Sequence, residues 1–145
     1  MNPKELVSSQ LYPSLTYEDA PAAIDWLCRT LGFVRRLVVP TADGGVKHSE
    51  LSLGPSVVMV SSPRPETGRV PRQGQKTTNF TLSLFVEDPD AHYQIAIAAG
   101  ADQIEPPSDT PFGARGYSVV DPEGYSWFFA NYRPGAYWSD EPCNP

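Results

Sequence analysis

The chain repeats itself, and this internal repeat constrains the fold more than any other feature of the sequence. The segment around residues 14–22 returns around residues 83–91. The identical residues are Ser14-Leu15 with Ser83-Leu84, Glu18-Asp19 with Glu87-Asp88, and Ala22 with Ala91. A duplicated sequence predicts a duplicated supersecondary unit. At 145 residues the chain can hold two such units in one compact domain.

Both copies show the same order of local signals. An alternating segment, Leu11 to Tyr17 or Phe80 to Val86, predicts a half-buried strand. Asp19 and Asp88 then suit helix N-caps, and Pro89 suits the first helical position. Gly32 and Gly100 suit the left-handed helix ends. The apolar helix faces are expected to be Ile24, Leu27 and Leu31 in the first copy, and Ala91, Ile95 and Ala98 in the second.

Three further strands are expected after each helix. The expected ranges are 33–39, 47–53 and 57–61 in the first copy, and a weak strand near Gln103, then 115–120 and 125–130, in the second. Each copy is therefore strand-helix-strand-strand-strand, and the fold class is α+β. We expect a single domain, 1–145, with modules at approximately 8–62 and 79–131, a linker at 63–78 and a C-terminal tail at 132–145.

The linker and the tail are the two irregular segments. The linker is rich in proline and glycine, which favours a solvated connection. Its cationic side chains offer the alternative of an anion site; they are Arg64, Arg69, Arg72 and Lys76. The tail carries Tyr132, Tyr137 and Trp138, whose apolar area could cover a subunit interface or fold over the chain's own module.

Composition excludes several classes of partner. A formal net charge of -6 opposes binding to a phosphate backbone, so no nucleic acid is expected. No apolar stretch is long enough to cross a bilayer, and residues 1–10 lack the pattern of a signal peptide. We expect a cytoplasmic protein without a membrane partner. Cys28 and Cys143 are expected to be free thiols, because neither CxxC spacing nor a disulfide framework is present.

Two motifs carry a resemblance to a known family. The stretch from Leu15 to Leu27, with the Leu31-Gly-Phe33 ending, precedes a second motif, Gly113-Ala-Arg-Gly-Tyr-Ser-Val-Val-Asp-Pro-Glu-Gly124. Together with the repeat, these motifs resemble the small bacterial glyoxalase-like proteins of the vicinal-oxygen-chelate superfamily. The resemblance implies paired modules that form a curved mixed sheet around a cleft.

The resemblance also implies up to four metal ligands, one on each outer strand. The corresponding positions hold Tyr12, Met59, Thr81 and Phe128. None of these residues replaces a His or a carboxylate as a ligand for a divalent metal. We therefore expect no metal and no cofactor.

Strand alternation assigns the residues that face the cleft. If Pro122-Glu123 is a two-residue hairpin loop, then Tyr117 pairs with Phe128, and Arg115 pairs with Ala130, on the concave face. The same reasoning pairs Glu50 with Met59 and His48 with Ser61. The expected ligand-binding residues are Tyr12, Ser14, His48, Glu50, Met59, Thr81, Ser83, Phe85, Arg115, Tyr117 and Phe128. For Arg115 the sequence equally allows a structural role, in which it bonds backbone carbonyls near the turn. His92 is expected at the surface.

Two functions fit this lining. The first is a metal-independent protein that binds an aromatic compound or antibiotic, as the resemblance to bleomycin resistance proteins implies. The second is a lyase, isomerase or dioxygenase of the glyoxalase type, with His48 and Glu50 as the catalytic candidates. The resemblance further implies a homodimer. The ligand itself cannot be named from the residues.

Overall fold

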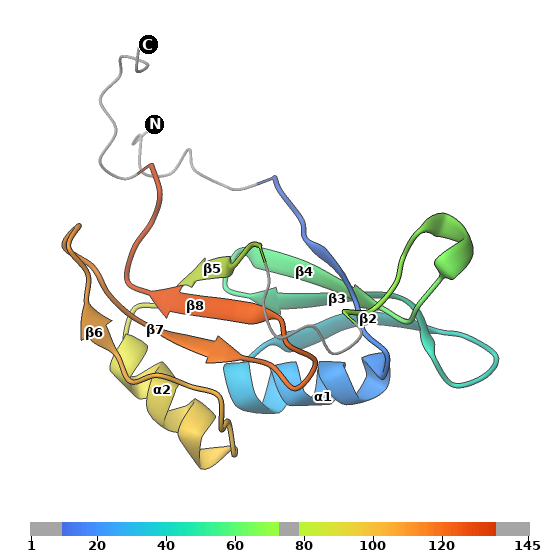
Figure 1. The fold of residues 1–145 in the computed structure, drawn as a ribbon, viewed down its shortest axis with the longest axis horizontal. Coiled ribbons are helices and arrows are strands. Elements are labelled where there is room, and N and C mark those ends of the chain that lie inside the picture. The colour runs from blue at the N-terminus through green and yellow to red at the C-terminus, as the bar shows by residue number, and fades with distance from the viewer. Residues whose placement is uncertain (1–9, 73–78, 136–145) are drawn as a thin grey trace, which may run out of the picture.

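The structure of the chain is a computed structural model that describes residues 10–72 and 79–135. Its first module contains a four-stranded mixed sheet with strand order β1-β4-β3-β2. The elements are β1 (Ser14–Thr16), α1 (Ala20–Leu31), β2 (Val34–Pro40), β3 (Val46–Leu53) and β4 (Ser56–Ser61). In this sheet β1 runs parallel to β4, and the other pairs are antiparallel. Figure 1 shows α1 on one side of the sheet.

The second module repeats this topology, with strand order β5-β8-β7-β6. Its elements are β5 (Leu82–Phe85), α2 (Pro89–Ala98), β6 (Ser108–Asp109), β7 (Arg115–Val120) and β8 (Ser126–Ala130). The weak strand expected near Gln103 appears as a single bridge between Ile104 and Val119, and the named strand β6 follows it. The α+β class with two strand-helix-strand-strand-strand modules is therefore confirmed.

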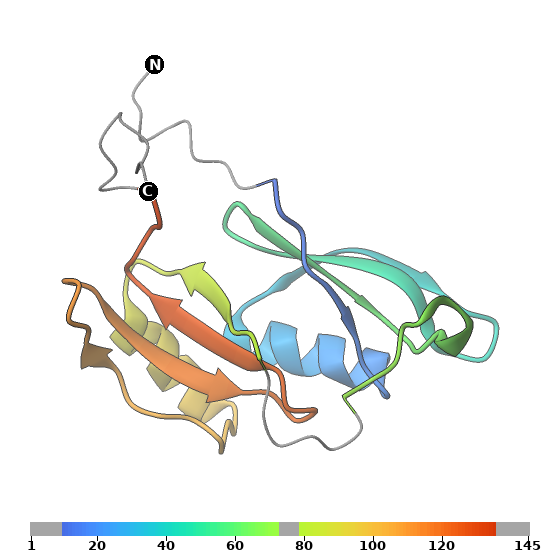
Figure 2. The same ribbon diagram turned by 45° about the horizontal axis from the view of Figure 1, so that its top comes forward.

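The two modules share one hydrophobic core. Figure 2 shows the first sheet curving over α1 and α2 lying behind the second sheet, and the two helices are in contact. Side chains from both modules meet between them; for example, the ring of Phe33 contacts the ring of Trp127 edge-on. Burying apolar area from both halves in one core stabilises their relative placement.

The first helix forms where the sequence predicts it. Asp19 caps its N-terminus by accepting a hydrogen bond from the backbone N–H of Ala22, and Gly32 ends the helix at φ 79°. Ile24, Leu27 and Leu31 are all buried, as expected. The local pattern was sufficient here because α1 has one apolar face and lies against one sheet.

The second helix buries a different face from the expected one. Its cap is confirmed, since Asp88 accepts from the backbone N–H of Ala91. However, Ile95 is 57% exposed, and Ala96 is fully buried with His92 partly buried beside it. The helix has a weakly amphipathic sequence, so packing rather than periodicity decides its orientation.

His92 belongs to a partly buried polar network, so its expected place at the surface is wrong. Its Nδ1 accepts a hydrogen bond from the hydroxyl of Tyr117, and its Nε2 donates to the carbonyl oxygen of Leu31 at 2.8 Å. These two contacts are those of a neutral imidazole. Burial lowers the pKa of His92 and raises that of Tyr117.

The turn at residues 121–125 joins the two modules. The buried carboxylate of Asp121 accepts hydrogen bonds from the Tyr17 hydroxyl at 2.6 Å and from the Trp127 indole at 3.0 Å. Glu123 accepts from the backbone N–H groups of Glu18 and Asp19 at the start of α1. The Asp-Pro-Glu-Gly motif is therefore a junction between modules as well as a turn.

The described part of the linker lies against this junction. It contains the short 3-10 helix η2 (Pro65–Thr67), and the guanidinium of Arg72 lies over the ring of Tyr125 and donates to the carbonyl oxygen of Gly124. Lys76, Tyr137, Trp138 and Cys143 lie outside the described residues. No described helix is long and apolar enough to cross a membrane.

Candidate functional site

Each sheet has one face that its helix covers and one face that it does not, which we call the open face. Alternating burial along β8 shows the division: Trp127 and Phe129 are fully buried, and Ser126 and Phe128 between them are half-buried. The open face of the second sheet consists of Ser83, Phe85, Gly116, Ser118, Val120, Ser126, Phe128 and Ala130.

Two aromatic rings dominate the open face of the second sheet. Ser83 pairs with Phe128, and Phe85 pairs with Ala130, so the two phenylalanines are diagonal neighbours on adjacent strands. Gly116 makes room for one of them, because a Cβ at this position would lie 2.7 Å from Cζ of Phe128. A half-exposed pair of rings beside small serines is a surface suited to stacking.

The hairpin between β7 and β8 differs from the expected one by one residue. Tyr117 pairs with Phe129 rather than with Phe128, because the turn occupies residues 121–125 instead of two residues. A shift of one residue moves every side chain of the strand to the other face. Tyr117 is consequently 1% exposed in the core, and its predicted place in the cleft is wrong.

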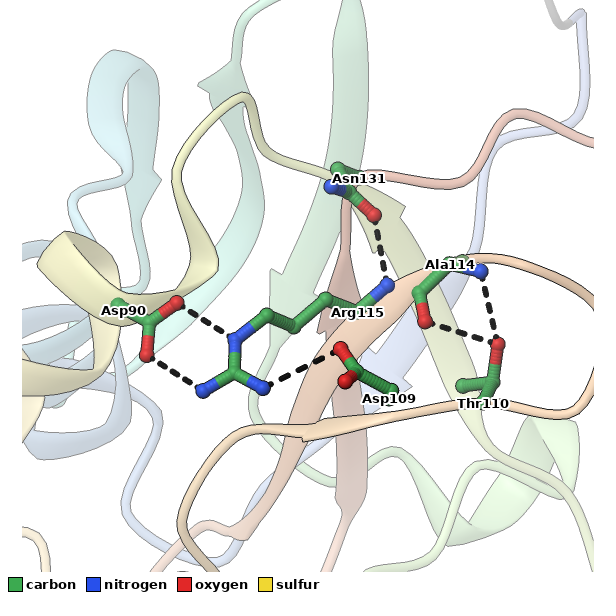
Figure 3. Close-up of polar contacts among 6 residues, drawn as sticks. All are labelled: Asp90, Asp109, Thr110, Ala114, Arg115 and Asn131. Atoms are coloured by element: carbon green, nitrogen blue, oxygen red, sulfur yellow. Dashed lines mark hydrogen bonds and ion pairs between the residues drawn. The ribbon is translucent and has the colours of Figure 1, made fainter.

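The same shift places Arg115 on the helix side of the sheet, which corrects its expected position on the concave face. Figure 3 shows its guanidinium in a two-pronged contact with Asp90 of α2, with distances of 2.8 and 2.9 Å, and a third contact with Asp109 of β6. Its backbone N–H donates to Oδ1 of Asn131 at 2.7 Å. The geometry supports the structural alternative for Arg115, which ties α2 to two strands.

The open face of the first sheet carries the two titratable candidates. His48 and Glu50 lie on β3, and Nε2 of His48 is 2.9 Å from Oε2 of Glu50. Both side chains are about two-fifths exposed, at 41% and 42%. On the neighbouring strands Ser14 pairs with Met59, and the register of β3 with β4 places Glu50 opposite Met59, as expected.

Two expected site residues lie outside the strands. Tyr12 precedes β1 and is 50% exposed, and Thr81 precedes β5 and is exposed. Residues of both modules also line a hollow of about 660 Å³ at the junction. Its lining is Ser14, Leu15, Thr16, Gly68, Arg69, Val70, Arg72, Asn79, Phe80 and Tyr125. Among the expected site residues, only Ser14 reaches this hollow.

Known proteins share the sequence pattern and the fold of this chain. The family model described as Glyoxalase/Bleomycin resistance protein/Dioxygenase superfamily matches residues 10–129. The chain belongs to this superfamily. A protein of Mycobacterium bovis is 32% identical over 124 residues, which cover 83% of this chain and 82% of that protein.

Solved structures of the superfamily share the fold. TioX from Micromonospora sp. ML1 is 36% identical, with a TM-score of 0.69, and the match covers 86% of this chain and 99% of TioX. Lactoylglutathione lyase from Agrobacterium tumefaciens is 17% identical, with a TM-score of 0.63, over 86% of this chain and 94% of the lyase. At that identity the second match shows the common fold alone.

The metal centre that the superfamily implies does not fit the side chains of this chain. Of the four corresponding positions, Met59 and Phe128 lie on β4 and β8, Thr81 immediately precedes β5, and Tyr12 lies two residues before the start of β1. A thioether, a phenyl ring and a threonine hydroxyl are poor ligands for a divalent cation, and tyrosine is only an occasional one. Within residues 10–72 and 79–135, no group of three or more His, Cys, Asp or Glu side chains could hold a metal.

One residue of the open face was missed by sequence reasoning. The guanidinium carbon of Arg133 lies 3.5 Å from the centre of the Phe85 ring. Arg133 follows β8 in a stretch that the sequence predicts as irregular tail, and no periodicity assigns it to a face. The tertiary contacts of residues 131–133 place it on the open face.

Proposed function

We propose that this protein binds a small planar aromatic compound on the open face of the second sheet, without the metal that many superfamily members use. The observation that carries the proposal is the half-exposed pair Phe85 and Phe128 on a sheet face without helix cover. Aromatic surface with a few hydroxyl groups is the usual lining of small-molecule sites. An antibiotic is a ligand of this class, as the bleomycin resistance proteins of the superfamily suggest.

A second copy of the chain completes this site in our proposal. Among the described strands, β1 pairs only with β4 and β5 pairs only with β8, so each sheet presents a free edge beside its open face. A two-fold homodimer can pair such edges and place two open faces opposite each other. Light scattering at micromolar concentration should give about twice 15.9 kDa; a concentration-independent monomer contradicts the dimer.

Binding is tested with 2-naphthamide, a neutral planar probe, by calorimetric or fluorescence titration. Phe128→Ala should weaken binding by about fivefold or more, because it removes one stacking ring. Ile95→Ala is the control, since Ile95 is also a large exposed apolar side chain but lies on α2, away from the open face. Equal affinities of the two variants contradict the proposed site.

A glyoxalase-type lyase, isomerase or dioxygenase is the second candidate function, and the contact between His48 and Glu50 favours it. In this arrangement Glu50 orients the imidazole, and His48 serves as the general base. Turnover of the hemithioacetal of methylglyoxal and glutathione, abolished by His48→Gln, supports this alternative. Absence of turnover together with naphthamide binding supports the first function.

A further inference from the structure

Arg133 lies flat on one of the two rings of the open face. Its guanidinium carbon is 3.5 Å from the centre of the Phe85 ring. This distance equals the usual separation between two stacked planar groups. An edge-on guanidinium would need more room for its N–H groups, so the two planes are stacked. Stacking occupies one face of the guanidinium and leaves its N–H groups around the rim free to donate.

The segment that carries Arg133 is held in place by its neighbours. The backbone N–H of Asn131 donates to the carbonyl oxygen of Arg115 at 3.0 Å, which continues the pairing beyond β8. The ring of Tyr132 contacts the ring of Phe112, with 4.9 Å between centres. These contacts direct the chain so that residue 133 returns over the open face.

Two other arginines of the fold form ion pairs with carboxylates. Arg35 pairs with Asp25, and Arg115 pairs with Asp90 and Asp109. Within the part of the chain that the structure describes, Arg133 makes no ion pair or hydrogen bond, and its guanidinium stacks on the Phe85 ring. An exposed cation without a carboxylate partner, fixed beside a stacking surface, is arranged to meet an anion.

We propose that Arg133 selects aromatic ligands that carry a carboxylate. The inference rests on the proposed function: the ligand ring stacks on Phe128, and its carboxylate receives the paired N–H groups of Arg133 above Phe85. Diagonal neighbours on adjacent strands lie about 7–8 Å apart, so a bicyclic ring on Phe128 can bring a directly attached carboxylate to the rim of the guanidinium above Phe85. The guanidinium matches a planar carboxylate in a two-pronged contact that a neutral amide cannot reproduce.

The test compares 2-naphthoate with 2-naphthamide, which have the same ring and nearly the same shape but differ in charge. The unmodified protein should bind 2-naphthoate about tenfold more tightly. Arg133→Ala should abolish this preference and leave the affinity for 2-naphthamide within about twofold. Arg133→Lys should retain part of the preference, because a lysine keeps the charge and loses the planar fork.

Arg35→Ala is the control for net charge, because it also removes one cation but lies beside α1, where it pairs with Asp25. It should keep the full preference for 2-naphthoate. Equal affinity of the unmodified protein for both compounds, or a preference that survives Arg133→Ala, overturns the role of Arg133 and leaves the proposed function standing. Tighter binding of 2-naphthamide by Arg133→Ala also overturns it, since Arg133 would then be a cover over Phe85. If neither compound binds, both proposals fail.

Discussion

The hydroxyl of Tyr17 donates a 2.6 Å hydrogen bond to the carboxylate of Asp121, across 104 residues of sequence and between the two modules. Both residues are 1% exposed. Burial, and then the charge of Asp121, raise the pKa of Tyr17 well above its usual value, so the phenol remains a donor. A buried bond to a charged acceptor couples the stability of one module to the other.

Removing either partner should destabilise the whole domain. Tyr17→Phe keeps the ring and should lower the free energy of unfolding by about 1.5–3 kcal/mol. Asp121→Asn should cost more, because its amide group would face the donors of Tyr17, Trp127 and the backbone of Tyr125. Urea unfolding measures both effects. Asp102→Asn, at an exposed position, is the control; a comparable loss there would contradict the argument.

The neutral state of His92 predicts a loss of stability in mild acid. Its folded-state pKa is lowered by burial, so the unfolded chain binds the proton more readily. The stability contributed by the neutral ring is complete above about pH 6.5 and is lost as the pH falls toward the lower folded pKa. The free energy of unfolding should therefore fall more steeply from pH 7 to pH 5 in the unmodified protein than in His92→Gln. Parallel pH profiles would exclude this role.

Gly116→Ala should disturb both the fold and the site. The added Cβ would lie 2.6 Å from Cβ of Ala130 and 2.7 Å from Cζ of Phe128, so the ring must move. Overpacking of this kind costs about 1–3 kcal/mol. Chemical unfolding and 2-naphthamide titration should both show the loss. Ser118→Ala, on the same face, adds no atoms and should keep the stability of the unmodified protein.

The side chains at the superfamily's metal positions predict that a chelator has no effect. Because Met59 and Phe128 lack suitable donor atoms, the purified protein should contain no stoichiometric divalent metal. Its melting temperature should be the same before and after treatment with EDTA. Elemental analysis that finds one equivalent of zinc, nickel, manganese or iron after chelation would show this prediction to be wrong.

The sequence by itself determined the modules, the caps and the first helix of this protein. Asp19, Asp88 and Gly32 act on the backbone within a few residues of themselves, so their roles can be read from local order. The alternating sequence of β8 likewise puts Trp127 and Phe129 on one face and Phe128 on the other, and the first two are buried. The open-face positions of Phe85 and Phe128 followed from the same alternation, because a strand has a period of two residues.

Only the tertiary structure decided the register of those strands, and with it the side of the sheet on which each side chain lies. Asp121 holds the turn to Tyr17, which is distant in sequence, and the resulting turn length shifts Tyr117 and Arg115 from the open face to the helix side. The place of Arg133 depends in the same way on contacts that local pattern does not encode. The periodicity of a strand divides its residues into two faces, but long-range contacts determine the register that assigns each face to the core or to the open side.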